Sequence, residues 1–386
     1  MQKNKLLVLS NGFPEIYTER YHCQFVYEQT RLVTSLFSMI SVISPQPYLP
    51  PFLRTIPQLS GYAKLSGFHD YKIQNLSIYY PTYLTLPLPY FQEHNNIPMA
   101  RAIHQSLRSS DISYDIAHVH FLYPTGEAAL SIIPSTVHKI LSLHGGDLYK
   151  WATLPINRAR AQATLRAYDR LHVPSQYLAR VLQALDPTLD PKRIYIIPPA
   201  IDTTLFSQKE KKQGDPIILM VANLVPEKGH EDALLAFAAL LKQVPQAKLK
   251  IVGTGPLYSQ LSTKIKILQL THSVELVGSI AHHDLPKWYH AASLLLFPSY
   301  AESFGIVQIE AMACGTPVVA YDNEGSKEIF AAHPDYLVKV GNIPDLVKKM
   351  QLTLLHPPSS QKLQTIVEPY REHVVAKKLA ALYRFS

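Results

Sequence analysis

Short apolar segments alternate with longer amphipathic ones along most of the chain. In the first half this pattern predicts five buried strands, at 6–10, 37–44, 116–121, 139–145 and 170–175. Each is bounded by a turn signal or followed by a helical pattern, and such alternation is typical of βαβ units and a parallel sheet. The proline- and tyrosine-rich stretch 45–100 gives no simple pattern. Its segment 79–91 is either a lipid-facing or acceptor-facing surface or a loop packed on its own domain.

The second half repeats the rhythm more clearly. Apolar runs predict strands at 216–224, 248–255, 273–278, 293–299 and 316–322. Apolar residues at helical spacing predict helices at 231–244, 284–292 and 305–315. Because these short strands are apolar throughout, both of their faces are expected to be buried, as parallel sheets require.

The length and one proline pair predict two domains. A single hydrophobic core stops growing near about 250–300 residues, and this chain has 386. Two consecutive prolines interrupt IIPPAIDTTLF (196–206), so we place the domain boundary at about residue 200. The tail 368–385 carries apolar residues at three- and four-residue steps, which predicts a final helix.

Charge and cysteine content indicate the cellular compartment and the classes of partner. Cys23 and Cys314 are the only cysteines, which excludes a disulfide framework and favours a reducing cytoplasm. The apolar runs are shorter than the roughly 20 residues of a membrane span. The net charge of +8 has two interpretations. It is that of an ordinary basic protein, or it serves to attract a diphosphate ligand or the anionic phospholipid at the inner face of a membrane. The lysines and arginines are scattered, so nucleic acid is not an expected partner.

The clearest chemical signal is the string AESFGIVQIEAMACGTPVVA (301–320). Glu302 lies in the loop after a predicted strand, and Glu310 lies eight residues further on, in the following helix. Free backbone N–H groups at a helix start bind anions, and a carboxylate further in can accept hydrogen bonds from a diol. The spacing therefore suits a diphosphate, a sugar and a ribose laid along one helix. The alternative is two solvent-facing glutamates near a helix start.

This string resembles the E-x7-E segment of the large GT-B retaining glycosyltransferase family 4. Further segments resemble family features in the same order. They are the strand ends at 118–126 and 141–149, the interdomain joint at 196–206, the donor-phosphate loop at 220–237, the glycine turn at 251–256 and the base-binding loop at 275–280. The resemblance implies an α/β GT-B fold, in which two Rossmann-like domains face each other across a cleft. Residues 1–199 would form the acceptor-side domain and 200–367 the nucleotide-sugar domain, with the helix 368–386 packing back on the first.

The resemblance also implies the reaction and the residues that carry it. The expected partners are a nucleotide-diphosphate-sugar donor and a hydroxyl of a glycan or lipid-linked acceptor, with retention at the transferred carbon. Lys228 would neutralise the leaving diphosphate, Glu302 would hold hydroxyls of the sugar, and His144, before Gly145, would contact the sugar near the reacting carbon. The expected donor-binding residues are Asn223, Gly278, Ser303, Phe304, Gly305, Ile306, Val307 and Glu310.

Several positions depart from the family pattern or stay open. Asn223 stands where the family usually has arginine, so one positive charge on the diphosphate is missing. His120 lines the acceptor side or is simply buried, and Asp147 is an acceptor-side residue or a helix N-cap. We expect His118 and His120 to point to opposite faces of their strand, and His282 and His283 to be solvated.

No cofactor is expected, and no divalent metal, because the chain has no Asp-x-Asp motif. Gly253 and Gly255 begin a dinucleotide fingerprint, but Tyr258 occupies its third glycine position, which argues against a nicotinamide enzyme. Two alternatives to sugar transfer stay open. One is a nucleotide-sugar epimerase or a phosphorylase of the same fold, and the other is a non-catalytic nucleotide-sugar-binding protein.

Overall fold

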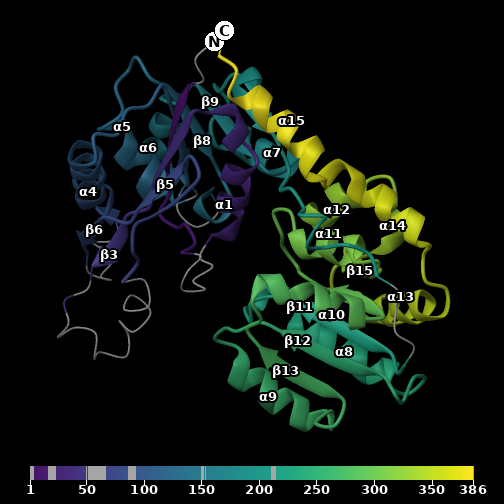
Figure 1. Cartoon of the computed structure of the whole chain (residues 1–386). Coiled ribbons are helices and arrows are strands. Elements are labelled where there is room, and N and C mark those ends of the chain that lie inside the picture. The colour runs from purple at the N-terminus through teal and green to yellow at the C-terminus, as the bar shows by residue number, and fades with distance from the viewer. Residues whose placement is uncertain are drawn as a thin grey trace. The chain divides into compact units, whose positions relative to one another are not determined.

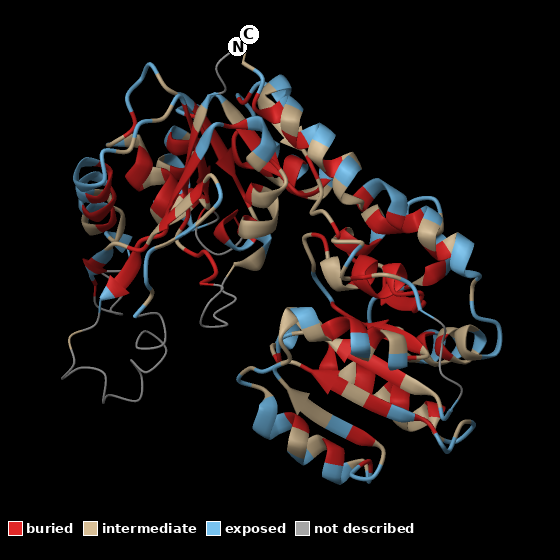
Figure 2. Ribbon diagram, in the orientation of Figure 1, coloured by how far each residue is buried: buried red, intermediate tan, exposed pale blue. Residues whose placement is uncertain are grey.

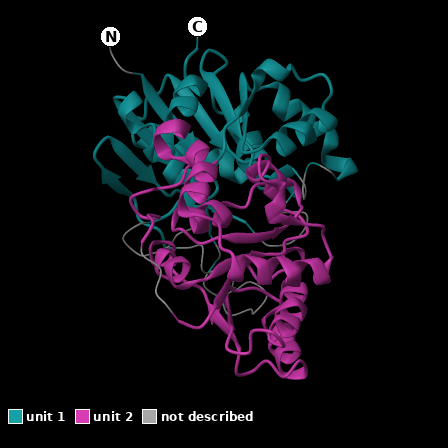
Figure 3. Cartoon of the chain, turned by 90° about the vertical axis from the view of Figure 1, so that its right-hand side faces the viewer, with its two compact units in different colours: residues 1–198, 376–386 teal, residues 199–375 magenta. Residues whose placement is uncertain are grey.

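A computed structural model of the chain describes residues 4–15, 23–48, 50, 67–85, 93–148, 152, 154–209 and 214–385. The chain divides into two units, Met1–Pro198 with Ala376–Ser386 (unit 1) and Pro199–Val375 (unit 2), drawn in two colours in Figure 3. The chain passes from unit 1 to unit 2 between Pro198 and Pro199, beside the proline pair at which the sequence analysis placed its boundary. Part of the proline- and tyrosine-rich stretch, including 86–91 of the segment 79–91, lies outside the described residues.

Unit 1 is built on an eight-stranded sheet in the order β10-β9-β8-β7-β1-β2-β5-β4 (Figure 1). Neighbouring strands are parallel except for β4, which runs antiparallel to β5. A separate parallel pair joins β3 and β6. The strands are β1 (Lys5–Leu9), β2 (Met39–Ile43), β3 (Gln46–Tyr48), β4 (Tyr71–Ile73), β5 (Leu76–Tyr79), β6 (Thr82–Leu84), β7 (Ile116–His120), β8 (His138–Ser142), β9 (Arg170–Val173) and β10 (Ile194–Ile196).

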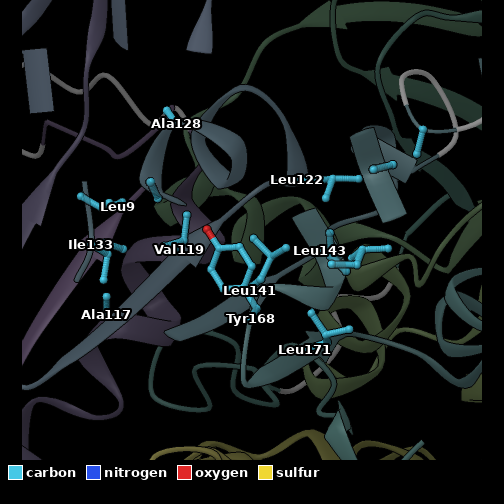
Figure 4. Close-up of a cluster of buried hydrophobic side chains, with 14 of the residues drawn as sticks. Leu9, Ala117, Val119, Leu122, Ala128, Ile133, Leu141, Leu143, Tyr168 and Leu171 are labelled. Atoms are coloured by element: carbon cyan, nitrogen blue, oxygen red, sulfur yellow. The ribbon is translucent and has the colours of Figure 1, made fainter. Parts of the chain in front are cut away.

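The core of unit 1 explains why the predicted apolar runs became strands. Most residues of β1, β7 and β8 are buried, as Figure 2 shows by colour. Apolar side chains from one face of each strand pack with Leu122, Ile133 and Tyr168 in one cluster (Figure 4). The described helices of this unit are α1 (Gln24–Arg31), α4 (Asn96–Ser109), α5 (Glu127–Leu130), α6 (Pro155–Arg166) and α7 (Gln176–Leu185).

Unit 2 is a six-stranded parallel sheet in the order β13-β12-β11-β14-β15-β16. Its strands are β11 (Ile217–Val221), β12 (Lys248–Val252), β13 (Val274–Gly278), β14 (Leu294–Phe297), β15 (Val318–Tyr321) and β16 (Leu337–Val338). Its helices are α8 (His230–Leu240), α9 (Tyr258–Ile267), α10 (Leu285–Ala291), α11 (Ile306–Ala313), α12 (Glu324–Ile329), α13 (Ile343–Leu355) and α14 (Ser360–Val367). Two separate apolar clusters pack in this unit, one with residues of α8, α9 and α13 and the other with residues of α10, α11 and α14. Burial on both faces accounts for the fully apolar β14 and β15. The same expectation was wrong for β13, an edge strand whose residues after Val274 are exposed or half-buried.

The final helix is shorter than its sequence pattern predicts. α15 covers Glu372–Leu382, while Glu368–Tyr370 is a separate 3-10 turn containing Pro369. Arg371 between them is extended and pairs with Ile201 in a parallel bridge. The prediction of one helix from 368 was therefore wrong, because the extended Arg371 interrupts it. Only the part of α15 from Ala376 onward belongs to unit 1.

One glycine brings the loop after β11 against the loop after β14. Gly229 has a φ of 69°, and a Cβ built on it would lie 1.9 Å from the carbonyl oxygen of Pro298. Next to this contact, the Tyr300 N–H donates to the Glu227 carbonyl at 2.9 Å. Only a residue without a side chain allows this approach at this backbone angle, so Gly229 fixes the spacing of the two loops.

We predict that Gly229→Ala lowers the free energy of unfolding by about 2–4 kcal/mol, because it adds both a left-handed backbone penalty and a steric clash. Urea unfolding of purified variants measures this.

Two alanine variants separate those causes. Gly341 shares the positive φ, but a Cβ there meets nothing within 4 Å, so Gly341→Ala should cost about 1 kcal/mol. Gly214 has neither feature, so Gly214→Ala should change stability by less than about 0.5 kcal/mol. Equal stability of all three variants would show that the contact with Pro298 is not fixed.

Candidate functional site

The order of strands in unit 2 creates a break between β11 and β14. From β11 the chain proceeds through β12 to β13 on one side, and from β14 through β15 to β16 on the other. The connections therefore leave these two neighbouring strands in opposite directions, and ligands of open parallel sheets bind at such a point, beyond the carboxyl ends of the strands. Lys228 follows β11 and Glu302 follows β14, so both lie at this position.

Lys228 and Glu302 form an ion pair across the break. The Nζ–Oε2 distance is 2.5 Å, and the side chains are 19% and 17% exposed. The close approach of Gly229 to Pro298 holds the two loops at the separation that this pair requires. Both groups stay within reach of solvent, so a charged ligand can compete for either one.

The start of α11 lies next to this pair. Gly305 caps the helix with a φ of 87°, and its Cβ position would be 2.5 Å from the Gln308 Nε2 and 3.2 Å from the Glu302 Cγ. The first N–H groups of a helix, here those of Ile306 and Val307, have no partner within the helix. Phe304 is buried against Tyr370, with ring centroids 5.4 Å apart, and anchors the loop. Ser303 donates its N–H to Glu302 Oε1 at 3.3 Å.

Glu310 lies in a different environment from Glu302. It is 2% exposed, and its Oε1 and Oε2 lie 2.8 Å from His282 Nε2 and Tyr289 Oη. Burial, and then the charge of Glu310, raise the pKa of Tyr289, so its hydroxyl stays a donor to the carboxylate. The expectation that His282 is solvated was wrong, because its imidazole, 31% exposed, pairs with Glu310. His283 is 52% exposed.

Neither His282 nor Tyr289 was predicted from the sequence to be a site residue. The one available signal for His282 was its position just after β13, whose carboxyl end lies at the same sheet edge as those of β11 and β14. Tyr289 belongs to α10, and its hydroxyl meets Glu310 only because α10 and α11 pack together.

Three glycines of unit 2 differ in how closely other atoms approach them. A Cβ on Gly253 or Gly255 would lie 1.9 or 2.5 Å from the carbonyl oxygens of Ala222 or Leu224. These two glycines therefore let the loops after β11 and β12 pack closely. Gly278 has a φ of 87° but an open Cβ position.

Asn223 precedes Leu224 in the loop after β11 and is exposed.

In unit 1 the carboxyl ends of β7 and β8 bring two histidines together. His120 Nδ1 lies 3.0 Å from His144 Nε2, and the two rings are nearly parallel, at 4°. Burial is the main cause that lowers both pKa values, that of His144 to about 3. Both rings are therefore neutral at pH 7, and one nitrogen donates while the other accepts. The ring of the exposed Phe25 lies 4.5 Å from that of His144.

Asp147 organises the backbone around this histidine pair. Its Oδ2 accepts the Leu122 N–H at 2.9 Å, and its Oδ1 accepts those of His144, Gly145 and Leu148 at 3.1–3.2 Å. Burial raises the pKa of this carboxyl, and the N–H donors oppose that effect. Both oxygens are engaged by the main chain, so Asp147 ties the loop after β8 to the loop after β7.

His118 and His120 point to the same face of β7, and the opposite expectation was wrong. Their ring centroids lie 4.5 Å apart in a stacked arrangement. Residues two positions apart on a strand share a face, because the side-chain period is two.

The residues that the structure describes show neither a metal-binding cluster nor a helix that could span a membrane. Among them, no group of three or more histidine, cysteine, aspartate or glutamate side chains is arranged to hold a metal ion. Within the same residues, every helix is too short or too polar to cross a membrane.

Four histidines of unit 1 predict that acid destabilises the protein: the buried His118, His120 and His172 and the half-buried His144. Burial is the first cause that lowers each pKa, that of His172 to about 4. Because the unfolded chain binds these protons near pH 6.5, stability is full above that pH and is lost as pH falls toward 4. At pH 5 we expect His172 alone to cost about 2 kcal/mol.

Thermal unfolding between pH 7.5 and pH 5 checks this prediction. That range lies above the usual pKa of aspartate, so most carboxylates do not titrate in it. A melting temperature that stays constant over the range would contradict it.

Two known protein families match this chain over the residues of the candidate site. The pattern of the family described as "Glycosyl transferases group 1" matches residues 202–368, and that of "Glycosyltransferase Family 4" matches residues 64–205. The first match spans the β11–β14 break, Lys228, Glu302 and Glu310, and the second spans His120, His144 and Asp147.

Individual proteins agree with these matches. The chain is 29% identical over 323 residues to TuaC of Bacillus subtilis, named for teichuronic acid biosynthesis, covering 78% of this chain and 76% of TuaC. It is 31% identical over 233 residues to D-inositol 3-phosphate glycosyltransferase 1 of Catenulispora acidiphila, covering 54% of this chain and only 56% of that protein. The fold matches HepE of Anabaena, solved with UDP and glucose, with a TM-score of 0.67, 18% identity and 98% of each chain covered.

The two family patterns, these relatives and the fold lead to one conclusion: the chain belongs to glycosyltransferase family 4 and is a glycosyltransferase with the GT-B fold.

Proposed function

We propose that this protein transfers a hexosyl group from a nucleotide-diphosphate-sugar to a hydroxyl of a glycan or lipid-linked acceptor, with retention and without a divalent metal. The observation that carries the proposal is the Lys228–Glu302 pair at the break between β11 and β14, beside the open start of α11. It places a cation, a carboxylate and helix N–H donors at one sheet edge, which is the set that a diphosphate-linked sugar requires.

The diphosphate would bind Lys228 and the N–H groups of Ile306 and Val307. Negative charge grows on the diphosphate as it leaves, and donors already aimed at that charge need no reorganisation during the reaction. A lysine ammonium is a compact point charge that suits this task. Asn223 supplies no charge. Lys228 and the helix start would therefore contribute more of the stabilisation of the diphosphate than they would if an arginine stood at position 223.

The two carboxylates would take separate parts of the donor. When the diphosphate draws Lys228 toward itself, Glu302 is released to accept hydrogen bonds from hydroxyls of the transferred sugar. Glu310 would hold the ribose. Each of its oxygens has a second lone pair besides the one used by His282 or Tyr289, and His282, 31% exposed, is the partner that a ribose would displace.

His144 would contact the transferred sugar, and His120 would fix its orientation through the 3.0 Å contact. Asp147, occupied by four main-chain N–H groups, is assigned a positioning role. For the acceptor hydroxyl, we assign the proton to an oxygen of the leaving diphosphate on the same face of the sugar. That route yields retention without a separate base.

The relatives support the substrate classes. TuaC is named for the biosynthesis of teichuronic acid, and the structure of HepE holds UDP and glucose. We therefore take a UDP-sugar as the first donor to test and a saccharide hydroxyl as the first acceptor. The second candidate is a nucleotide-sugar-binding protein without transfer activity, which the exposed Asn223 favours because it lowers the positive charge at the diphosphate site.

Lys228→Ala tests the proposal. In the presence of EDTA the parent protein should transfer sugar to give a product with the anomeric configuration of the donor, measured by proton NMR. In the variant we expect kcat to fall about 100-fold, since loss of one charge-stabilising donor costs about 2.7 kcal/mol.

Lys327→Ala is the matched control, because Lys327 is an exposed lysine paired with Glu324 on α12. It should transfer at the parent rate. An inverted product, loss of activity in EDTA, or equal rates for Lys228→Ala and Lys327→Ala would reject the proposal. Donor binding without transfer to any acceptor would favour the second candidate.

A second pair of variants decides how Glu310 acts. If its carboxylate contacts the ribose directly, Glu310→Gln should weaken the affinity for nucleoside diphosphate about tenfold, because a hydrogen bond to a charged group is worth about 1.5–3 kcal/mol. His282→Ala should leave that affinity unchanged or stronger, since it frees Oε1. Titration calorimetry measures both.

His283→Ala is the control, because His283 is the neighbouring histidine, is 52% exposed and pairs with Asp284. If His282→Ala weakens binding as much as Glu310→Gln does, the ribose contact runs through the imidazole and the direct contact is wrong.

A further inference from the structure

Five groups of unit 1 form one continuous chain of hydrogen bonds. Tyr383 Oη lies 2.5 Å from His118 Nδ1, and His118 Nε2 lies 2.6 Å from Ser142 Oγ. Ser142 Oγ then lies 2.7 Å from His172 Nδ1, and His172 Nε2 lies 2.9 Å from the Ile197 carbonyl oxygen. This hydrogen-bond chain therefore runs from the C-terminal segment across β7, β8 and β9 to the segment after β10.

The carbonyl end fixes the direction of every bond. A carbonyl only accepts, so His172 carries its proton on Nε2, and its Nδ1 accepts from the Ser142 hydroxyl. The Ser142 oxygen then accepts from Nε2–H of His118. His118 Nδ1 in turn accepts from the Tyr383 hydroxyl. Gln29 adds a weaker contact, 3.4 Å from His172 Nδ1.

All four side chains are buried, and both histidines are neutral. Burial lowers the pKa of His118 well below its usual value and that of His172 to about 4. Each ring nitrogen thus has one role, and a buried chain with every member satisfied specifies one arrangement of its parts.

The two ends of the hydrogen-bond chain lie near the two places where the polypeptide passes between the units. Ile197 precedes Pro198, the last residue of the first stretch of unit 1, and Tyr383 follows α15, which enters unit 1 at Ala376. The C-terminal segment is also held by Arg170, which donates to the carbonyls of Ala381, Leu382 and Arg384 and lies 4.0 Å from the ring of Phe385.

The middle of the chain touches the candidate site. The ring of His118 stacks on that of His120, with centroids 4.5 Å apart, and His120 contacts His144. The carbonyl of Ser142 also accepts the N–H of Phe121, which directly follows His120 and has a positive φ of 71°. A shift of the His118 ring would therefore move the surface against which His120 rests.

We propose that His118 and Tyr383 are positioning residues for the transfer reaction. The chain Tyr383–His118–Ser142–His172–Ile197 holds the His118 ring against His120 and so fixes the orientation of the His120–His144 pair. This role rests on the proposed function of His144. It makes the docking of the C-terminal segment in unit 1 a condition for turnover, while donor binding in unit 2 does not depend on it.

Histidine ¹⁵N NMR of the full-length parent protein tests the chain without any variant or substrate. Both His118 and His172 should carry their protons on Nε2. In Tyr383→Phe, which keeps the ring beside Phe37 and removes only the hydroxyl, the His118 Nδ1 resonance should move, and the His120 and His144 resonances should move with it.

Kinetics test the positioning role in the same variant. We expect kcat of Tyr383→Phe to fall about tenfold, equivalent to about 1.4 kcal/mol in the barrier, with the donor KM changed less than about twofold. Tyr336→Phe is the matched control, because the buried Tyr336 hydroxyl makes no hydrogen bond within the described residues. It should keep the parent kcat.

The outcomes separate this proposal from the proposed function. A proton on Nδ1 of either histidine, or Tyr383→Phe with the parent kcat and unmoved His144 resonances, overturns the positioning role. If the parent protein binds nucleotide but transfers no sugar, the proposed function fails. The NMR shifts of His120 and His144 still decide whether the chain positions them.

Discussion

The close contact between Gly229 and the Pro298 carbonyl is the constraint on which the candidate site depends. A parallel sheet already places the ends of β11 and β14 at one edge, but it does not set how near their loops come. The absence of a side chain at Gly229 sets that distance, and Lys228 and Glu302 then meet as an ion pair. Backbone sterics, rather than attraction between the charges, determine the geometry, because a partly exposed ion pair contributes little to stability.

The two glutamates of one motif lie in different surroundings, which suit them to the different tasks proposed for them. Glu302, in a loop, faces the partly exposed ammonium of Lys228, which in the proposed reaction a diphosphate would draw away. Glu310, inside the helix, is buried against Tyr289 and His282, so its charge is compensated by hydrogen bonds that the fold supplies. Without donor, the Lys228 charge is balanced by Glu302. In the proposed reaction, donor binding would therefore be an exchange of partners, in which the diphosphate takes Lys228 and the sugar hydroxyls take Glu302.

The sequence predicted the parts of this arrangement that depend on local patterns. All ten predicted strands occur in the structure within a few residues, and most of their apolar side chains are buried. Lys228 and Glu302 stood out through motifs, but their pairing did not, since it depends on a contact between residues about 70 positions apart. His282 was missed for the same reason, as its partner lies on another helix. The tail helix failed at Arg371, where an extended backbone pairs with Ile201, a tertiary contact that no helical periodicity reports.

The candidate site residues of the two units differ in their electrostatics. The site in unit 2 is charged and partly exposed, which suits a ligand carrying two phosphates. In unit 1 the candidate pair of the buried His120 and the half-buried His144 is neutral. A neutral imidazole has one donor and one acceptor, so it can orient a sugar hydroxyl without attracting phosphate. Neutral groups lack the long-range attraction that would steer a substrate into place, so their precision must come from packing and hydrogen bonds. The directed chain from Tyr383 to Ile197 supplies that order, because reversing any one of its bonds would leave a buried polar atom without a partner.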